Sequence, residues 1–361
     1  MKVVYIGQAG DRLIDIPQND PNIDSCHAIA AGKLRRYHGE GLSQLLDLKT
    51  QYLNLKDVLR TLKGLYQSWR LLGKIRPEVV FTRGGFVSVP VALAAWLRGI
   101  PYMTHDSDSS PSLANRIIAH WAAVHAVALP KGLYPYPADK TFSVGVPIGS
   151  EYKLVDSQAM LKFRKSLGLD AYKQIICVTG GGNGAKTLND IVLENSSYLL
   201  KKYPHLAIVH IAGRSLEHDL VKAYNALLPK TERKRIIVKG YITDLYRYSG
   251  AADIVIARGG ATNLAEFASQ GKACIIIPSK QLVWNIKNAR TLADAGAILE
   301  LTEEHAEQER RLAHTISELL EDERKRKNMA QKFAQFSKPN ATSDIVELVL
   351  SLADKNRRLE G

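Results

Sequence analysis

Short runs of β-branched and other apolar residues alternate along the chain with longer stretches of helical periodicity. In the first half this pattern predicts strands at Val3–Ile6, Val79–Thr82, Tyr102–Thr104, Ala126–Ala128 and Thr141–Val144. In the second half it predicts strands at Gln174–Thr179, Leu206–Ile211, Arg235–Val238, Asp253–Ala257, Ala273–Ile277 and Ala297–Leu301, with helices across 303–355. Strands separated by crossover helices predict an α/β protein with parallel sheets.

The alternation is interrupted once. Gly145-Val146-Pro147 ends the first set of elements, and a polar, charged region from Ser150 to Tyr172 precedes the next strand. A length of 361 residues also fits two domains. We therefore predict domains over residues 1–150 and 151–361, the second of them doubly wound and completed by the terminal helices.

The composition is that of a globular protein, with 45% hydrophobic and 24% charged residues. Lys and Arg number 49 against 36 Asp and Glu, and the net charge of +13 favours an anionic partner: nucleic acid, an anionic membrane or a phosphorylated substrate. The sequence carries no recognised nucleic-acid motif, so we expect no nucleic-acid partner. Cys26, Cys177 and Cys274 have no paired spacing, which favours a reducing cytoplasm over a disulfide framework or a zinc site.

The region from Lys56 to Arg76 is dense in Lys and Arg, and Leu59, Leu62, Tyr66 and Trp69 recur in it at helical spacing. A basic amphipathic helix with an interfacial aromatic residue can lie on an anionic membrane. The alternative is a helix that packs within its domain and turns a basic face to solvent. The apolar stretches are shorter than the ~20 residues that a spanning helix needs, and no secretory leader opens the chain. We expect any membrane contact to be peripheral.

A glycine-rich loop, Gly180-Gly181-Gly182-Asn183-Gly184, follows the predicted strand at 174–179, and a helical pattern begins close behind it. Glycines there let backbone N–H groups approach a phosphate, with a helix N-terminus behind them. The string also fits a dinucleotide fingerprint, but the next strand is followed by Arg214 rather than by the acidic residue that NAD would need. An NADP site and a tight structural turn are the alternatives.

A second loop of this kind, Arg258-Gly259-Gly260-Ala261-Thr262, follows the strand at 253–257. We expect free N–H groups and a Thr/Asn cap at this helix start, with Arg258 as a phosphate-binding fork. The carboxylate of Glu266, one turn further on, can accept both vicinal hydroxyls of a ribose. A capping box with a solvated Glu is the alternative. Two such helix starts at strand ends of one domain predict a nucleotide held between them.

Two loops of the first half also fall at the carboxyl ends of predicted strands. Arg83-Gly84-Gly85-Phe86 follows the strand at 79–82, and His105-Asp106-Ser107-Asp108 follows the strand at 102–104. Asp106 or Asp108 is a candidate general base, with His105 beside them, and a turn rich in Asp and Ser is the alternative. The candidate acceptor-binding residues are Gly84, Gly85, Phe86 and Asn115.

These segments, in this order, resemble glycosyltransferase family 28. The resemblance rests on RGGFV at Arg83–Val87, His105–Asp108, Gly145-Val146-Pro147, GGGNGAKTLN at Gly180–Asn189 and RGGATNLAE at Arg258–Glu266, and it is most specific over 174–300. It implies the GT-B architecture, with two Rossmann-like doubly wound domains facing a central cleft, the UDP-sugar on the second and a lipid acceptor on the first. It also implies no metal or other cofactor, because helix N-termini and side chains replace a divalent ion on the diphosphate.

The resemblance assigns roles on the nucleotide side. Ile242 matches the position that packs uracil, and Glu266 matches the ribose carboxylate. Asn285 and Asn288 fall where the family places amides on the sugar hydroxyls, although Trp284 and Asn285 stand where paired glutamines are usual. The residues expected to bind the nucleotide-sugar are Gly181, Gly182, Asn183, Gly184, Ile242, Arg258, Gly259, Gly260, Ala261, Thr262, Glu266, Asn285 and Asn288.

The catalytic side departs from the family. Members open with a strand, a Gly-rich loop ending in His, and a helix, and that His is the favoured base. Met1–Gly10 resembles the family's second strand instead, so we expect the first domain to be truncated, without its opening unit. If Val3–Ile6 is itself the first strand, its loop supplies no His. Gly149 replaces the family's Arg after its Gly-Asn-Pro-Val motif.

The resemblance implies an inverting transferase of cell-wall or surface glycan synthesis, peripheral on the cytoplasmic face of the plasma membrane. It would move N-acetylglucosamine, or a related sugar, from a UDP-sugar to an acceptor linked to polyprenyl pyrophosphate. The base would be Asp106 or Asp108, or a His from a missing segment or a second protein. The alternative is a non-catalytic or partner-dependent subunit that binds the UDP-sugar.

Overall fold

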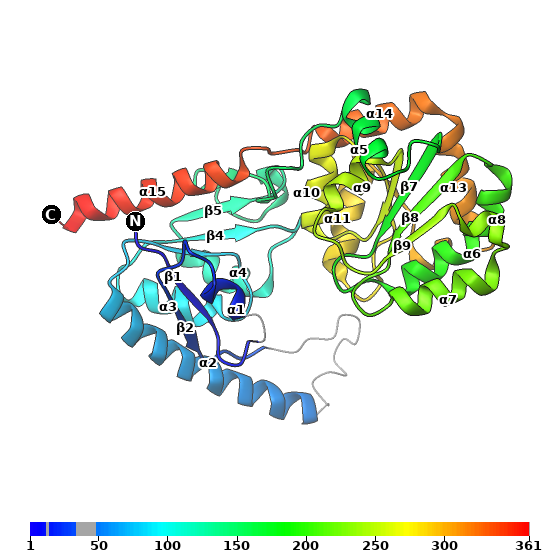
Figure 1. Ribbon diagram of the computed structural model, residues 1–361. Coiled ribbons are helices and arrows are strands. Elements are labelled where there is room, and N and C mark those ends of the chain that lie inside the picture. Colours follow the sequence, from blue (N-terminus) through cyan, green and yellow to red (C-terminus); the bar gives the residue numbers. More distant parts are fainter. Residues whose placement is uncertain (12–13, 34–47, 361) are drawn as a thin grey trace. The chain divides into compact units, whose positions relative to one another are not determined.

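The computed structural model describes residues 1–11, 14–33 and 48–360, and the chain divides into two compact units (Figure 1). The first unit comprises Met1–Val144 and Ser343–Gly361, and the second comprises Gly145–Thr342. The division falls a few residues ahead of the predicted boundary near residue 150. The assignment of all of 151–361 to the second domain is wrong at its end, because the last helix belongs to the first unit.

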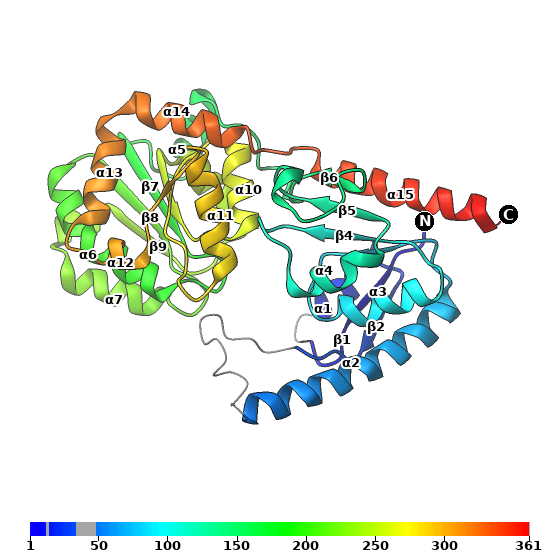
Figure 2. The same cartoon turned by 180° about the vertical axis from the view of Figure 1, so that it is seen from behind.

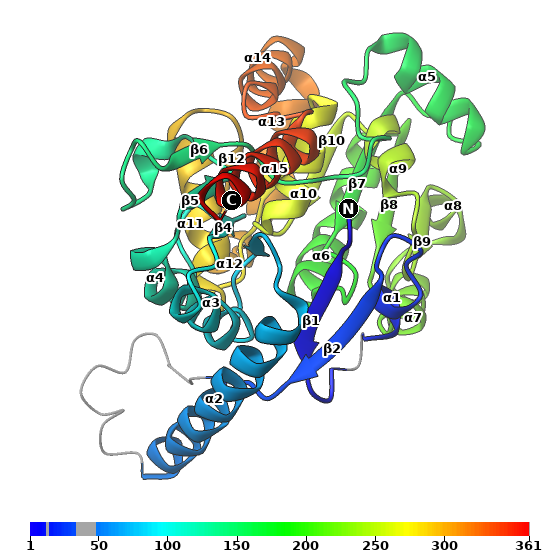
Figure 3. The same cartoon turned by 90° about the vertical axis from the view of Figure 1, so that its left-hand side faces the viewer.

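The first unit is built on two parallel sheets. Its elements are β1 (Val4–Gln8), α1 (Asp15–Gln18), β2 (Ser25–Ile29), α2 (Leu48–Ile75), β3 (Val80–Thr82), α3 (Ser88–Leu97), β4 (Tyr102–Asp106), α4 (Leu113–Ile118), η2 (Ala119–Trp121), β5 (Val124–Val127), η3 (Lys131–Leu133), β6 (Thr141–Ser143) and α15 (Ala341–Glu360). β1 pairs with β2 (Figure 3), and the larger sheet has the order β3-β4-β5-β6. The last helix joins this unit because Ile345 and Leu352 are buried against Met103 and Ala126.

The strand β2 was missed by the sequence pattern. Its residues mix polar and apolar side chains, and only Ile29 is buried. It pairs with β1 in parallel over its whole length, from Ser25 opposite Val4 to Ile29 opposite Gln8. Tertiary pairing therefore decides this strand rather than local hydrophobic periodicity.

The second unit is one doubly wound sheet with helices on both faces (Figure 2). Its elements are α5 (Ser157–Ser166), β7 (Gln174–Thr179), α6 (Lys186–Lys202), β8 (Leu206–Ile211), α7 (Glu217–Leu227), α8 (Lys230–Arg233), β9 (Ile236–Lys239), α9 (Leu245–Ala251), β10 (Ile254–Ala257), α10 (Ala261–Gln270), β11 (Ala273–Ile276), α11 (Val283–Asp294), β12 (Leu299–Glu300), α12 (Glu303–Ala306), α13 (Arg311–Glu321) and α14 (Glu323–Ala334). The strand order is β12-β11-β10-β7-β8-β9, with every pairing parallel. The strands predicted for this half are all present, with small shifts at their ends.

Alternation along the strands divides the core of this unit into two layers. In β7, Ile176 and Val178 face one core cluster, while Ile175 and Cys177 face the other. Helices α6 and α13 cover the first face, and α9, α10 and α11 cover the second. Because both faces are covered, the strands read as continuous apolar runs, which is why the pattern located them so well.

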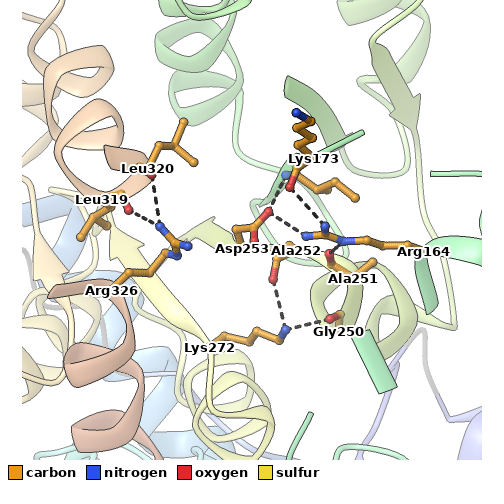
Figure 4. Close-up of polar contacts among 11 residues, drawn as sticks. Arg164, Lys173, Gly250, Ala251, Ala252, Asp253, Lys272, Leu319, Leu320 and Arg326 are labelled. Atoms are coloured by element: carbon orange, nitrogen blue, oxygen red, sulfur yellow. Dashed lines mark hydrogen bonds and ion pairs between the residues drawn. The ribbon is translucent and has the colours of Figure 1, made fainter. Parts of the chain in front are cut away.

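Buried polar side chains hold the amino ends of the central strands (Figure 4). Arg164 Nη2 lies 2.8 Å from Asp253 Oδ2, which also accepts the Ile175 N–H at 2.7 Å. Lys272 Nζ donates to the carbonyls of Gly250 and Ala252 at 2.7 and 3.1 Å, and burial lowers the pKa of Lys272 to about 8. These contacts stabilise the end of the sheet opposite to the glycine loops, so we assign them a structural role.

Candidate functional site

The two glycine-rich loops begin side by side at the centre of the second sheet. β7 and β10 are neighbours, and Thr179 pairs with Ala257 at their carboxyl ends. The strand order reverses there, which is where doubly wound sheets bind ligands. Beyond the loops, α6 and α10 begin after Ala185 and Gly260 with no side-chain cap among the described residues, so N–H groups of their first turns can meet an anion. The predicted Thr/Asn cap is therefore wrong, since Gly260 occupies the N-cap position.

A cavity of about 450 Å³ lies over these helix starts, within the second unit. This volume is in the range of small-molecule sites. The cavity is lined by the glycine loop and the start of α6, the loop before α10, the segment that follows β11, and one residue of α12. The lining residues are Gly180, Gly181, Gly184, Ala185, Lys186, Thr187, Arg258, Gly260, Asn263, Ser279, Lys280, Gln281, Leu282, Asn285 and Glu303.

Gly184 lets the glycine loop pass close to the end of β8. Its φ is +76°, and a Cβ at this position would lie 2.1 Å from the carbonyl oxygen of Ala212. That carbonyl accepts from Asn189 Nδ2 at 3.0 Å, and Asn189 Oδ1 lies 3.1 Å from His210 Nε2. Burial lowers the pKa of His210 to about 3, so the ring is neutral. This buried network fixes the backbone against which the loop packs.

Arg258 is held in an ion pair that sequence patterns did not reveal. Its Nη1 lies 2.7 Å from Glu303 Oε1 and donates to the Ile277 carbonyl at 2.9 Å. Only 12% of the Arg258 side chain and 4% of the Glu303 side chain are exposed. Arg258 nevertheless lines the cavity, so a residue that a buried acid holds in place borders the space where a ligand would lie.

Glu266 lies on α10, one turn beyond the loop. Its Oε2 accepts from Asn263 Nδ2 at 2.9 Å, and the Tyr152 hydroxyl donates to the same carboxylate. Burial raises the pKa of Glu266 to about 7, Asn263 and Tyr152 oppose the shift, and the nearby Glu151 adds to it. The reading of Glu266 as a solvated residue of a capping box is therefore wrong, because the side chain is partly buried and takes two donated hydrogen bonds.

Several predicted residues support the cavity without lining it. Asn288 Nδ2 donates to the Gly259 carbonyl at 2.9 Å, so it holds the loop before α10 in place. Asn285 does line the cavity, while Ile242 packs on the core of the sheet's second face. The predicted nucleotide-sugar residues outside the lining are Gly182, Asn183, Ile242, Gly259, Ala261, Thr262, Glu266 and Asn288.

In the first unit, the three catalytic candidates differ in what holds them. Asp106 is buried: its Oδ1 accepts from Asn115 Nδ2 at 2.7 Å and its Oδ2 accepts from the Tyr136 hydroxyl at 2.6 Å. Burial raises the pKa of Asp106, and these hydrogen bonds oppose the shift. His105 is fully buried, whereas Asp108 is half-buried. Asp106 is therefore occupied by structural hydrogen bonds, and Asp108 is the more accessible carboxylate.

The acceptor candidates come together around one backbone turn. Gly84 and Gly85 have φ of +82° and +87°, and a Cβ on Gly84 would lie 3.1 Å from Asn115 Oδ1. Asn115 is fully buried, and its Oδ1 has no hydrogen-bond partner within the described part of the chain. Phe86 is half-buried beside them in sequence. The structure thus joins Gly84 and Asn115, which are distant in sequence.

Comparison with known proteins connects both units to one family. The N-terminal domain model of glycosyltransferase family 28 matches residues 25–127, and the C-terminal domain model matches residues 175–345. The UDP-N-acetylglucosamine--N-acetylmuramyl-(pentapeptide) pyrophosphoryl-undecaprenol N-acetylglucosamine transferase of Geobacillus kaustophilus is 33% identical over 340 residues, which cover 92% of this chain and 85% of that protein. The chain belongs to glycosyltransferase family 28. Transferase 1 of the same description from Bacillus cereus is 31% identical over 310 residues, covering 84% of this family 28 chain and 81% of its relative.

Solved structures share the fold of this family 28 chain. MurG of Acinetobacter baumannii matches with a TM-score of 0.70 at 22% identity, covering 97% of this chain and 91% of that chain. UDP-GlcNAc 2-epimerase of Neisseria meningitidis, bound to UDP-GlcNAc, matches with a TM-score of 0.59 at 16% identity, covering 97% and 100%. The predicted fold, an α/β protein of two Rossmann-like domains of the GT-B class, is confirmed.

Ten of the fifteen residues that line the cavity of this family 28 protein are not among the predicted nucleotide-sugar residues. Lys186 and Thr187 lie at the start of α6, and Asn263 follows the predicted loop directly. Segment 279–282 and Glu303 follow β11 and β12, whose carboxyl ends meet the same sheet edge. The strand order would have pointed to these last residues, because loops after parallel strands share one edge.

Proposed function

We propose that this chain is an inverting glycosyltransferase that moves N-acetylglucosamine from UDP-GlcNAc to a sugar linked to a lipid pyrophosphate, in cell-wall or surface glycan synthesis. The observation that carries the proposal is a cavity that lies over both uncapped helix starts at the switch point of the second sheet. The Geobacillus and Bacillus relatives, which are named as transferases of this chemistry, support it. We further propose that Gly84, Gly85, Phe86 and Asn115 bind the acceptor.

In this mechanism an acceptor hydroxyl attacks the anomeric carbon of the donor sugar in line, and the C–O bond to UDP breaks with inversion. The departing diphosphate is stabilised by N–H groups at the starts of α6 and α10 and by Arg258. These dipoles are already oriented before the donor arrives, so they do not have to reorganise during the reaction. We propose that they act in place of a divalent ion on the diphosphate.

We propose Asp108 as the base that takes the proton from the acceptor hydroxyl. Asp106 is buried beneath hydrogen bonds from Asn115 and Tyr136, whereas Asp108 is half-buried and its backbone carbonyl is fixed by the Tyr134 hydroxyl at 2.9 Å. A carboxylate is an adequate base if it reaches the reacting hydroxyl. The alternative is a base supplied by a second protein.

The direct test incubates the protein with UDP-GlcNAc and a polyprenyl-pyrophosphate-linked sugar acceptor, with and without EDTA. We expect UDP release and a glycosylated lipid, unchanged by the chelator. UDP binding by calorimetry without turnover would favour the second candidate, a binding subunit that depends on a partner for its base. Absence of UDP binding would exclude both functions.

UDP affinity is expected to rise with pH through about 7. The pKa of Glu266 is about 7 in the free protein. Ribose hydroxyls that donate to the carboxylate favour its ionised form, so binding lowers this pKa. The UDP affinity is then maximal above about pH 7. Below it, the affinity falls by up to about tenfold per pH unit, because the Glu266 carboxyl must lose its proton when UDP binds. Calorimetric titration of UDP between about pH 5.5 and 8.5 measures this dependence.

The control is Glu266→Gln, which cannot titrate but leaves the ionisation of UDP itself unchanged. The difference in pH dependence between wild type and this variant is the contribution of Glu266. Tyr152→Phe removes a hydrogen bond that lowers the pKa of Glu266, so it should shift the transition to higher pH. Identical profiles for wild type and Glu266→Gln would contradict the assignment of Glu266 to the ribose.

We propose that α2 binds the inner face of an anionic plasma membrane. Leu65 and Leu72 pack the helix onto the core of the first unit. This agrees with the alternative of a helix that packs within its own domain. A second apolar stripe remains in solvent, flanked by Lys56, Arg60 and Lys63. The stripe consists of Tyr52, Leu55, Leu59, Leu62, Tyr66 and Trp69, each between 45% and 67% exposed. In the part of the chain that the structure describes, no helix is both long and apolar enough to span a bilayer.

Replacing Leu59 and Leu62 by serine is expected to weaken vesicle binding at least about tenfold, because each leucine loses about 1.5–3 kcal/mol of burial in the interface. Co-sedimentation with vesicles of phosphatidylglycerol and phosphatidylcholine measures the change. Leu161→Ser, at a comparably exposed leucine of α5, is the matched control and should bind as wild type. Equal loss in the control, or none in the double variant, would contradict a role for this stripe.

A further inference from the structure

The carboxylate of Glu303 is the one buried acid of the described cavity lining. It is the first residue of α12, but the N-cap of that helix is Thr302, whose side chain accepts from the His305 N–H. Glu303 Oε1 instead faces Arg258 Nη1 at 2.7 Å, and Oε2 accepts the Lys280 N–H at 3.3 Å. One carboxylate therefore links the loop before α10 to the segment after β11.

The ion pair with Glu303 leaves part of the Arg258 guanidinium available to a ligand. Nη1 alone makes the contacts with Glu303 and with the Ile277 carbonyl. These two contacts of Arg258 use neither Nε nor Nη2, and the residue lines the cavity. A guanidinium has five N–H donors, so it can be fixed through one nitrogen and still bind a phosphate through the others.

The other cations of the cavity are held differently. Lys186 pairs with Asp190 at 2.6 Å and Lys280 pairs with Glu304 at 3.9 Å, but the side chains of both pairs are largely exposed. Exposed pairs contribute little to fixing a geometry, whereas loss of one partner of a buried pair leaves an uncompensated charge. The Arg258–Glu303 pair is therefore the rigid electrostatic element of the site.

We propose that Glu303 is a positioning residue for the donor diphosphate. Its carboxylate fixes Arg258 and the backbone at Lys280 in the binding geometry before the donor arrives. This inference rests on the proposed UDP-sugar function. Without the carboxylate, Arg258 loses its fixed orientation and the two loops lose their common acceptor. The loss should affect ligands with a diphosphate and spare the nucleoside, because Glu303 holds Arg258 and the Lys280 N–H, whereas the predicted uracil and ribose residues are Ile242 and Glu266.

The test compares Glu303→Gln with Glu304→Gln, the adjacent and largely exposed acid, as matched control. Calorimetry with UDP and with uridine, and donor KM and kcat, are measured for each. We expect Glu303→Gln to weaken UDP binding and raise donor KM by about 10- to 100-fold, with uridine affinity unchanged. Glu304→Gln should resemble wild type. Unchanged or tighter UDP binding in Glu303→Gln would overturn the inference.

A double-mutant cycle separates positioning from general damage. If Glu303 acts through Arg258, Glu303→Gln combined with Arg258→Gln should bind UDP no more weakly than Arg258→Gln alone. The double variant leaves no unpaired buried charge, so it supplies the measurement if Glu303→Gln fails to fold. Additive losses would overturn the inference. Wild-type protein that binds no UDP would overturn the proposed function as well as this inference. Wild-type protein that binds UDP, together with a Glu303→Gln variant that binds it equally well, would overturn this inference alone.

Discussion

Replacing Gly184 by alanine is expected to weaken UDP binding at least about 100-fold, because the loop amides would move away from the diphosphate. Gly184 has a φ of +76°, and the new Cβ would lie 2.1 Å from the Ala212 carbonyl oxygen and 2.9 Å from Gly213 Cα. Neither neighbour can yield easily. The Ala212 carbonyl is held by Asn189, and the Gly213 N–H donates to the Gly240 carbonyl at 2.9 Å.

The measurement is UDP affinity by calorimetry together with the thermal unfolding midpoint. Gly168→Ala is the matched control, since Gly168 has a similar φ of +68° but nothing within 4 Å of the new Cβ. It should show only the modest cost of a left-handed alanine, about 1–2 kcal/mol in stability, with UDP affinity retained. Full UDP affinity in a folded Gly184→Ala variant would contradict the assignment of the glycine loop to the proposed nucleotide site.

Replacing Asp108 by asparagine is expected to lower kcat by about 10²- to 10⁴-fold, the usual contribution of a general base. The amide is of nearly the same size but cannot take a proton from the acceptor hydroxyl. UDP affinity should not change, because Asp108 lies in the first unit and the donor cavity is formed within the second. Turnover with the lipid acceptor and UDP binding are the two readouts.

Asp106→Asn is the informative comparison for Asp108. Its carboxylate accepts from Asn115 and Tyr136, so the change should lower thermal stability as well as activity. If Asp106→Asn loses activity at unchanged stability while Asp108→Asn stays active, then Asp106 is the base and Asp108 is not. Activity in both variants would exclude both carboxylates as the base and favour a base supplied by a second protein.

The strands of the second unit could be predicted because burial on both faces makes their sequences continuously apolar. The two loops after β7 and β10 were found for a related reason: glycines and Arg258 stand at the ends of clear strands. The strand β2 and the place of α15 were not predictable in this way. β2 depends on pairing with β1, and α15 is an amphipathic helix whose apolar side fits the first unit although its sequence follows the second.

The sequence by itself determined the fold class, the family and the position of the two glycine-rich loops that border the cavity, because hydrophobic periodicity and glycine placement are local properties. Only the tertiary structure decided which side chains are free to act. In the structure, Asp106 accepts hydrogen bonds from Asn115 and Tyr136. Asn288 donates to the Gly259 carbonyl, and Arg258 pairs with Glu303. These contacts join residues far apart in the chain, and whether a charged group is available to a ligand depends on the partner that burial brings to it.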